Sequence, residues 1–333
     1  MVTNEGLVVG LATRNRPALV CETLAITLAN IELPTTRVFV YIDDDDDASR
    51  DALRAAKFPP FKGTLTGVVR PRPDTIGEKW NWMLEENGEC YCIAVDHSCH
   101  RTQGWDRIVL DAARRFENGP GAVFGPLANM SFPALNACTR EWAHRIGYIY
   151  PPYFPYWFTD HWFDDVARMT ELVELAPIVV DSTRKQPTLE LREPAWWATW
   201  FDAARGLRER DALKVLGYPT RLIQGEAEQR LPTSHHPDPV AFRRRAALVT
   251  QDSIMINNNV RAMSDDLIRQ SHNPLCDERY VRAKLKARGM IPDMLALLSP
   301  QEREHYTRLL NPPSEVPSIP PAFATCTMIE AHS

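Results

Sequence analysis

The chain has 333 residues, which is enough for about two domains of ordinary size. Hydrophobic residues make up 44% of the sequence and charged residues 24%, as in a globular protein with a substantial core. The formal net charge of −5 gives no sign that the molecule as a whole binds nucleic acid or a membrane surface. The sequence shows neither a secretory signal at its start nor the about 18 apolar residues of a membrane span, so we expect a cytoplasmic protein. The seven cysteines are scattered and odd in number, which favours reduced thiols over a disulfide framework.

Short apolar runs alternate with helical patterns over the first part of the chain. The apolar runs predict buried strands at 6–12, 37–42, 65–69 and 91–95. The helical patterns predict helices at 18–29, 49–57, 76–86 and 105–116. This alternation predicts an α/β fold with a mostly parallel central sheet and helices on both of its faces.

The pattern loosens beyond residue 120 and becomes mainly helical. Further strands are predicted at 121–126 and 177–180, and helices at 159–170, at 190–217 and in pieces over 250–290. Ser299, Pro300 and Glu302 form a capping box with proline at the first helical position, so a helix begins there. We therefore predict a domain at 1–185, a mainly helical region at 186–310 and a proline-rich tail at 311–333.

Polar residues follow three of the predicted strands directly. They are Arg14 and Arg16 after the first strand, Asp43 to Asp47 after the second, and Asp96 with His97 after the fourth. Because ligands bind at the carboxyl edge of open α/β sheets, we expect these side chains to gather in one cleft there. For Asp46 and Asp47 we favour the simpler interpretation of a solvated acidic loop.

This arrangement resembles the GT-A glycosyltransferase fold over about residues 6–170, particularly the family 2-like enzymes of bacteria and phages. The motifs that carry the resemblance are ATRNRP at 12–17, YIDDD at 41–45, GEKWN at 77–81, Asp96 ahead of TQGWD at 102–106, and TDHW at 159–162. The resemblance implies an enzyme that moves a sugar from a nucleotide diphosphate onto an acceptor hydroxyl. Residues 186–310 would then complete the acceptor side.

The resemblance also implies which residues hold the donor, for which we expect a UDP-sugar. They are Thr13, Arg14, Arg16, Asp43, Asp44, Lys79, Asn81, Asp96 and Trp105. A guanidinium suits a phosphate through bidentate hydrogen bonds, and a carboxylate after the second strand suits the base or ribose. Structural alternatives stay open: a salt bridge at a helix N-terminus for one of the two arginines, and an exposed helix face for Lys79 and Asn81.

A divalent metal is the third implied component, because sugar transfer leaves extra negative charge on the departing diphosphate. Asp96 stands where the family carries an Asp-x-Asp motif, but His97 and Ser98 follow it and the second carboxylate is missing. Imidazole binds manganese better than magnesium. Three alternatives remain: His97 replaces the acid, Asp96 alone holds Mn²⁺ or Mg²⁺, or no metal is used. The resemblance makes His236 a candidate for a late metal contact, and capping of a nearby loop is the structural alternative for Asp96.

Asp160 lies in the aromatic stretch YWFTDHW at 156–162, just before a predicted helix. The resemblance implies that Asp160 is the acceptor-side base of an inverting transfer. The structural alternative is that Asp160 caps the helix, a position that aspartate favours.

The acceptor is the least determined component. Residues 201–290 carry 16 Lys and Arg against 11 Asp and Glu, and Arg243 to Arg245 could follow a phosphate backbone. Phage enzymes are within the resemblance, so a hydroxymethylated DNA base is one expected acceptor, and a saccharide or cell-envelope acceptor is equally open. A nucleotidylyltransferase or a dehydrogenase is disfavoured, because the loop after the first strand contains no glycine. A non-catalytic binding or scaffold protein on the same fold is the remaining alternative.

Overall fold

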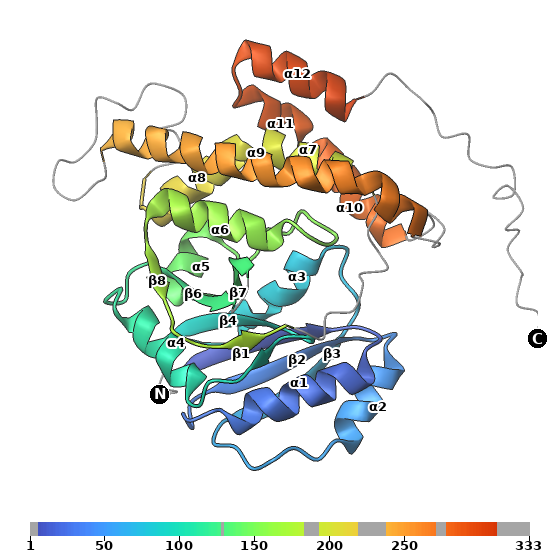
Figure 1. Ribbon diagram of the computed structural model, residues 1–333, viewed down its shortest axis with the longest axis vertical. Coiled ribbons are helices and arrows are strands. Elements are labelled where there is room, and N and C mark those ends of the chain that lie inside the picture. The colour runs from blue at the N-terminus through green and yellow to red at the C-terminus, as the bar shows by residue number, and fades with distance from the viewer. Residues whose placement is uncertain (1–5, 128–129, 183–192, 219–237, 271–277, 312–333) are drawn as a thin grey trace, which may run out of the picture.

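The structure is a computed structural model that describes residues 6–127, 130–182, 193–218, 238–270 and 278–311. Within those residues a nine-stranded sheet has the strand order β3-β2-β1-β4-β7-β6-β9-β5, with β8 beside β6. The sheet lies in the lower half of the molecule and the C-terminal helices are stacked above it (Figure 1).

The first half of the sheet is parallel, as the sequence predicts. It consists of β1 (Leu7–Thr13), β2 (Arg37–Asp43), β3 (Thr64–Arg70) and β4 (Cys90–Val95). Every residue of β1 is buried, because this strand lies between two parallel neighbours and under helices on both faces. The apolar run of the sequence is the direct consequence.

The second half of the sheet is mixed. β7 (Met130–Thr139) pairs antiparallel with both β4 and β6 (Ala122–Leu127). Three short strands complete the sheet: β5 (Cys99–His100), β8 (Val173–Leu175) and β9 (Val180–Asp181). The strand predicted at 177–180 overlaps β9 only at Val180, and β7 and β8 are strands that the sequence pattern did not indicate.

Helices cover both faces of the sheet (Figure 1). One face packs against α1 (Pro17–Ala29), α2 (Asp47–Ala55) and α4 (Trp105–Arg114). The other packs against α3 (Ile76–Asn81), which continues as the 3₁₀ turn η1 (Trp82–Glu85), and against α5 (Arg140–Ile146) and α6 (Thr159–Thr170).

The remaining helices extend the core above α6. They are α7 (Pro194–Ala203), α8 (Arg205–Val215), α9 (Pro239–Gln270), α10 (Glu278–Gly289), α11 (Ile291–Ala296) and α12 (Pro300–Leu310). The predicted capping box at Ser299 and Glu302 is present at the start of α12. One hydrophobic cluster runs from Val8 in β1 to Leu310 in α12, so the helical region shares its core with the sheet. Among the helices described, none combines the length and the apolar character that crossing a bilayer requires.

Candidate functional site

Three parallel strands end side by side at the carboxyl edge of the sheet. Ala12 of β1 lies opposite Tyr41 of β2 and Val95 of β4, so the residues that follow these strands start from neighbouring points. The polar side chains that the sequence predicts at the strand ends are brought together here, in a network of ion pairs and hydrogen bonds. We call this network the edge cluster. Its members are Thr13, Arg14, Arg16, Asp43, Asp45, Arg72, Lys79, Asp96, His97 and Arg279.

Asp43 is at the centre of one half of the edge cluster. Its side chain is 2% exposed and its oxygens lie 2.8 Å from Lys79 Nζ, 3.1 Å from Arg14 Nη1 and 3.8 Å from Arg72 Nε. Lys79 also donates to the backbone oxygen of Thr13, at 2.8 Å. Burial lowers the pKa of Lys79, and the contact with Asp43 opposes this shift. Lys79 therefore fixes the end of β1 relative to Asp43, which is a positioning role rather than an exposed helix face.

Arg14 points from the first loop toward the second. Its guanidinium binds Asp45 through two hydrogen bonds, Nη1 to Oδ1 at 2.6 Å and Nη2 to Oδ2 at 3.1 Å. The hydrogen bond from Arg14 is the main cause of the lowered pKa of Asp45. Arg279 of α10 approaches the same carboxylate, with Nη2 3.7 Å from Oδ2. Two arginines that are far apart in the sequence, Arg14 and Arg279, therefore lie close to the Asp45 carboxylate.

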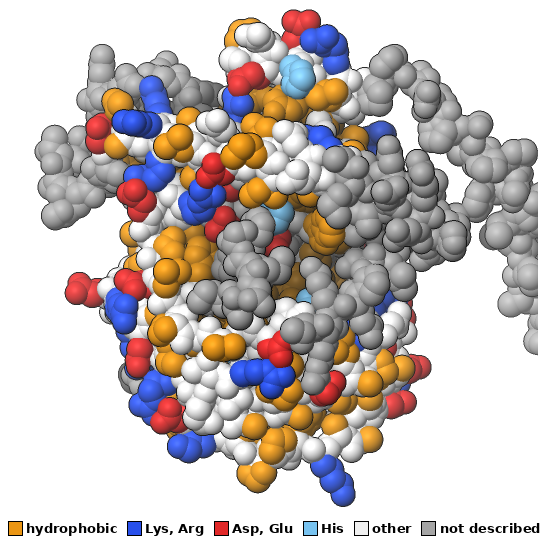
Figure 2. Space-filling view, viewed as in Figure 1, with side chains coloured by type: hydrophobic (Ala, Val, Ile, Leu, Met, Phe, Trp, Pro, Cys, Tyr) orange, Lys and Arg blue, Asp and Glu red, His pale blue; other side chains and the backbone are white. Residues whose placement is uncertain are grey.

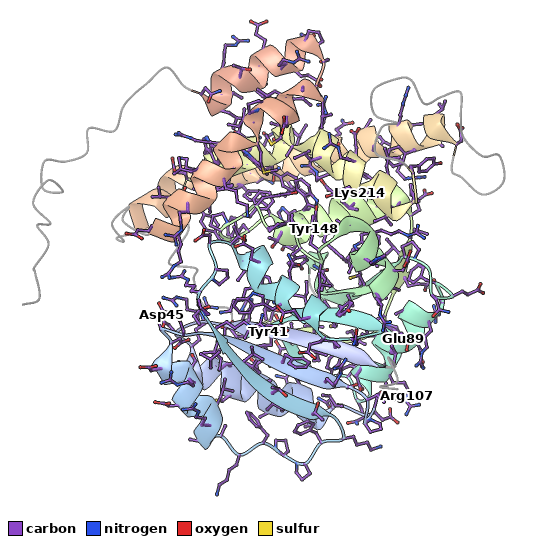
Figure 3. All side chains as sticks on the ribbon, turned by 180° about the vertical axis from the view of Figure 1, so that it is seen from behind. Tyr41, Asp45, Glu89, Arg107, Tyr148 and Lys214 are labelled. Atoms are coloured by element: carbon purple, nitrogen blue, oxygen red, sulfur yellow. The ribbon has the colours of Figure 1, made fainter. Side chains whose placement is uncertain are left out.

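Figure 3 shows Asp45 at the border of the sheet, on the side of the molecule from which the C-terminal helices descend toward it. Arg72 and Arg279 are members of the edge cluster that the sequence analysis missed. Arg72 lies two residues beyond β3, so the rule that found the other strand-end residues would also have found it. Arg279 has no local signal, because only the fold brings α10 to this edge.

The aspartates of the acidic loop differ in burial, and one of them is not where the sequence analysis expected it. Asp46, expected in a solvated loop, is buried, and this expectation is wrong: its oxygens accept from Ser49 N at 3.1 Å and from Asn15 N at 2.7 Å. Asp46 therefore caps α2 and holds the loop that follows β1. Asp47 is exposed and pairs with Arg50 of its own helix, and Asp44 is also exposed, so the expectation holds for Asp47.

Asp96 is at the centre of the other half of the edge cluster. Its Oδ2 accepts from Thr13 Oγ1 at 3.1 Å, and its Oδ1 lies 3.1 Å from Arg16 Nη1 and 3.2 Å from His97 Nδ1. The residue is 4% exposed, and its backbone oxygen accepts from Thr23 Oγ1 at 2.7 Å. Both carboxylate oxygens are therefore occupied by groups of the protein itself.

The described residues do not form a complete site for a divalent metal by themselves. No group of three His, Cys, Asp or Glu side chains among them is arranged to ligate an ion, and Asp96 with His97 supplies only two donors. His100 is a core residue: it packs against Trp105 at 4.1 Å between ring centroids, and burial lowers its pKa to about 3. His236 lies outside the described residues.

The side chains of two predicted donor-binding residues make hydrogen bonds that hold parts of the fold together. Trp105 is fully buried and its indole donates to Thr27 O at 3.1 Å, which ties α4 to α1. The amide of Asn81 donates to Tyr150 O at 2.8 Å, and its oxygen accepts from Ile149 N at 2.9 Å. Asn81 therefore anchors the segment that leads to α6.

Asp160 is exposed in the first turn of α6. Its Oδ1 accepts from the backbone of the next residue, His161, at 3.0 Å, and no side chain caps this helix, so the capping alternative is not realised. The two residues ahead of the helix, Trp157 and Phe158, have φ angles of 24° and 68°, in the left-handed region that non-glycine residues avoid. Packing of Phe158 against Phe154 and Phe201 holds this strained turn, and strain of this kind gathers at functional sites.

Comparison with models of protein families and with curated protein sequences gives no match. The structure, however, is similar to that of S. aureus TarS 1-349 in complex with UDP-GlcNAc, with a TM-score of 0.51 and 12% identity over 92% of this chain and 88% of that one. Mannosyltransferase PcManGT from Pyrobaculum calidifontis, in complex with GDP-Man and Mn²⁺, gives a TM-score of 0.44 and 15% identity over 91% and 83%. The likeness to TarS, together with the sheet topology, confirms the predicted GT-A fold.

Proposed function

We propose that this protein is a glycosyltransferase that moves a sugar from a nucleotide diphosphate onto an acceptor hydroxyl. The edge cluster carries the proposal. Among the described residues, five Lys and Arg side chains gather around Asp43, Asp45 and Asp96, where parallel strands end. A diphosphate is an anion that such a group of cations suits. The fold neighbour TarS, whose structure holds UDP-GlcNAc, supports a nucleotide-sugar donor, and we take a UDP-sugar as the first choice.

Arg14 is the donor-binding residue with the clearest geometry. It already makes a bidentate contact with the Asp45 carboxylate, and a phosphate oxygen pair presents the same shape to the guanidinium. Because Arg14 is 24% and Asp45 45% exposed, the two can separate into water at low cost when a phosphate arrives. When the Asp45 side chain moves away from Arg14, the contact between Arg14 and Asp43 keeps the guanidinium in position.

Asp160 is the proposed base of an inverting transfer. The acceptor oxygen attacks the anomeric carbon while the bond from that carbon to the diphosphate oxygen breaks. The acceptor proton passes to the Asp160 carboxylate, and the electron pair of the broken bond leaves with the diphosphate, where the cations of the edge cluster stabilise it. The N-terminal turn of α6 favours negative charge at this position, and the strained turn ahead of it fixes the direction of the helix start.

The acceptor that the charges favour is a saccharide or another neutral hydroxyl-bearing polymer. The basic residues at 201–290 do not form a stripe that could follow DNA, because most of those described pair with carboxylates within the protein. These pairs are Arg205 with Glu302, Arg208 with Asp165, Lys214 with Asp211, Arg245 with Glu171, Arg261 with Asp202, Arg279 with Asp45, Arg282 with Asp74, Lys284 with Glu193, and Lys286 with Glu78. Figure 2 likewise shows positive and negative side chains interspersed over the face in view. Nothing among the described residues supports a DNA acceptor, which stays a prediction.

The proposal is tested by incubating the protein with a panel of nucleotide sugars and measuring the release of nucleoside diphosphate. Replacing the base in Asp160→Asn should lower kcat by about 10²- to 10⁴-fold while leaving the affinity for UDP unchanged. Asp111→Asn, an exposed carboxylate on α4, is the matched control and should keep full activity. A protein that binds none of the nucleotides would contradict the proposal and would instead be a binding or scaffold protein on this fold.

A further inference from the structure

Arg16 occupies the carboxylate that a metal ion would need. Its Nη1 lies 3.1 Å from Asp96 Oδ1, and Thr13 holds the other oxygen of the same carboxylate. A divalent cation on Asp96 would have to displace Arg16 or stand against its positive charge. Because Asp96 is 4% exposed, little water is present to screen that repulsion.

The backbone also fixes Arg16 at this position. Arg16 is the N-cap residue of α1, with Pro17 at the first helical position and Val20 N donating to Arg16 O at 3.0 Å. Its side chain is 21% exposed. A guanidinium has five N–H donors, and among the described residues Asp96 is the only hydrogen-bond partner assigned to this one. One nitrogen of the Arg16 guanidinium is therefore bound to Asp96, and the other N–H groups can donate hydrogen bonds to a ligand.

Resting on the proposed function, we propose that Arg16, oriented by Asp96, binds and stabilises the departing diphosphate in place of a metal ion held by the protein. Of the three alternatives that the Asp96-His97-Ser98 sequence leaves open, the geometry favours transfer without a metal. Asp96 is then a positioning residue, and the positive charge at the leaving group is a planar guanidinium with directed hydrogen bonds. Arg14, on the other side of Thr13, supplies the second guanidinium.

The test is calorimetric titration of UDP and GDP into the 333-residue protein, once with excess EDTA and once with excess Mn²⁺. We expect dissociation constants that agree within about threefold between the two conditions. Arg16→Gln should weaken binding by about 10- to 100-fold in EDTA, the range of one charge-assisted contact. Arg16→Lys keeps the positive charge but loses the planar guanidinium, so its dissociation constant should lie between those of the wild type and Arg16→Gln.

A second comparison tests whether Asp96 acts by orienting Arg16 or by binding a metal ion itself. Asp96→Asn should weaken binding less than Arg16→Gln, and adding it to Arg16→Gln should cause little further loss, because Asp96 acts through Arg16. Arg107→Gln, an exposed arginine of α4, is the control and should bind as the wild type does. Thermal unfolding of each variant verifies that it is folded.

Two results would overturn the inference. Nucleotide binding that needs Mn²⁺ or improves more than about tenfold with it, and loses this gain in Asp96→Asn, would make Asp96 a metal ligand. Binding that is unchanged in Arg16→Gln would remove Arg16 from the site. A wild-type protein that binds neither nucleotide under either condition would contradict the proposed function itself, and the inference would fall with it.

Discussion

The protein contains two clusters of arginine and aspartate that differ in the exposure of their carboxylates and in the number of arginines near the surface. In the helical region, Arg208 Nε lies 2.8 Å from Asp165 Oδ2 with the two side chains 0% and 2% exposed. Asp202, which is 2% exposed, accepts from Asn257 at 2.7 Å and pairs with Arg261, which is 27% exposed. At the sheet edge Asp45 is 45% exposed, and the three arginines Arg14, Arg16 and Arg279 are 21–29% exposed.

The difference separates a structural role from a binding role. Both carboxylates of the helical cluster are buried and their pairs join α6, α7, α8 and α9, so we assign this cluster a structural role. The edge cluster has three partly exposed arginines and an exposed carboxylate, Asp45, and we propose that an anionic ligand replaces this carboxylate. The number of ion pairs alone would not distinguish the two.

The largest expected effect is on stability, in the helical cluster. Arg208→Met leaves Asp165 buried with Ser253 as its remaining hydrogen-bond donor, and we expect a loss of about 3–5 kcal/mol in the free energy of unfolding by urea. The double variant Arg208→Met with Asp165→Leu should recover most of this loss. UDP binding by the folded fraction should not change. Wild-type stability of the single variant would show that the buried pair does not hold the helices.

A smaller effect concerns Asp164 on α6, whose carboxylate lies 3.9 Å from Arg168 Nη1. Burial, followed by the nearby Asp165, raises the pKa of Asp164 from 3.8 to about 6. The folded protein therefore holds a proton that the unfolded chain releases, and stability should fall by up to about 3 kcal/mol as the pH rises from 4 to 6. Asp164→Asn should flatten this part of the pH profile of urea unfolding. An unchanged slope in the variant would contradict the assignment.

The smallest effect is expected from one arginine of the edge cluster. Arg14→Gln should weaken UDP binding by about 10- to 100-fold, because one charge-assisted bidentate contact is lost. The free energy of unfolding should change by no more than about 1 kcal/mol, since Asp43 keeps Lys79 and Arg72 as partners. Arg54→Gln, an exposed arginine on α2, is the control for calorimetry. A large loss of stability with unchanged affinity would place Arg14 with the structural pairs.

The sequence predicts the parallel half of the fold well, because its strands are buried on both sides and read as unbroken apolar runs. It misses β7, which contains Pro133 and Asn136 and has no such run, it misses the short strands β5 and β8, and it places β9 a few residues too early.

The members of the edge cluster that lie at the end of a strand or just after it, such as Arg14, Asp43 and Asp96, were predicted from the sequence. Asp46 was misjudged, although Ser49 three residues later gives the spacing of a helix cap, because five successive aspartates look alike in sequence. Arg279 could not be found, since no pattern in the sequence tells which helix end will meet a loop more than two hundred residues earlier.

The central claim is that the edge cluster holds a diphosphate through its Lys and Arg side chains. The most direct measurement compares the affinity of the protein for UDP and GDP with that for uridine and guanosine, by calorimetry at low and high salt. We expect the diphosphates to bind at least about 100-fold more tightly than the nucleosides, with an advantage that shrinks as salt is added. Equal affinities for nucleosides and diphosphates, or an advantage that salt leaves untouched, would contradict the account.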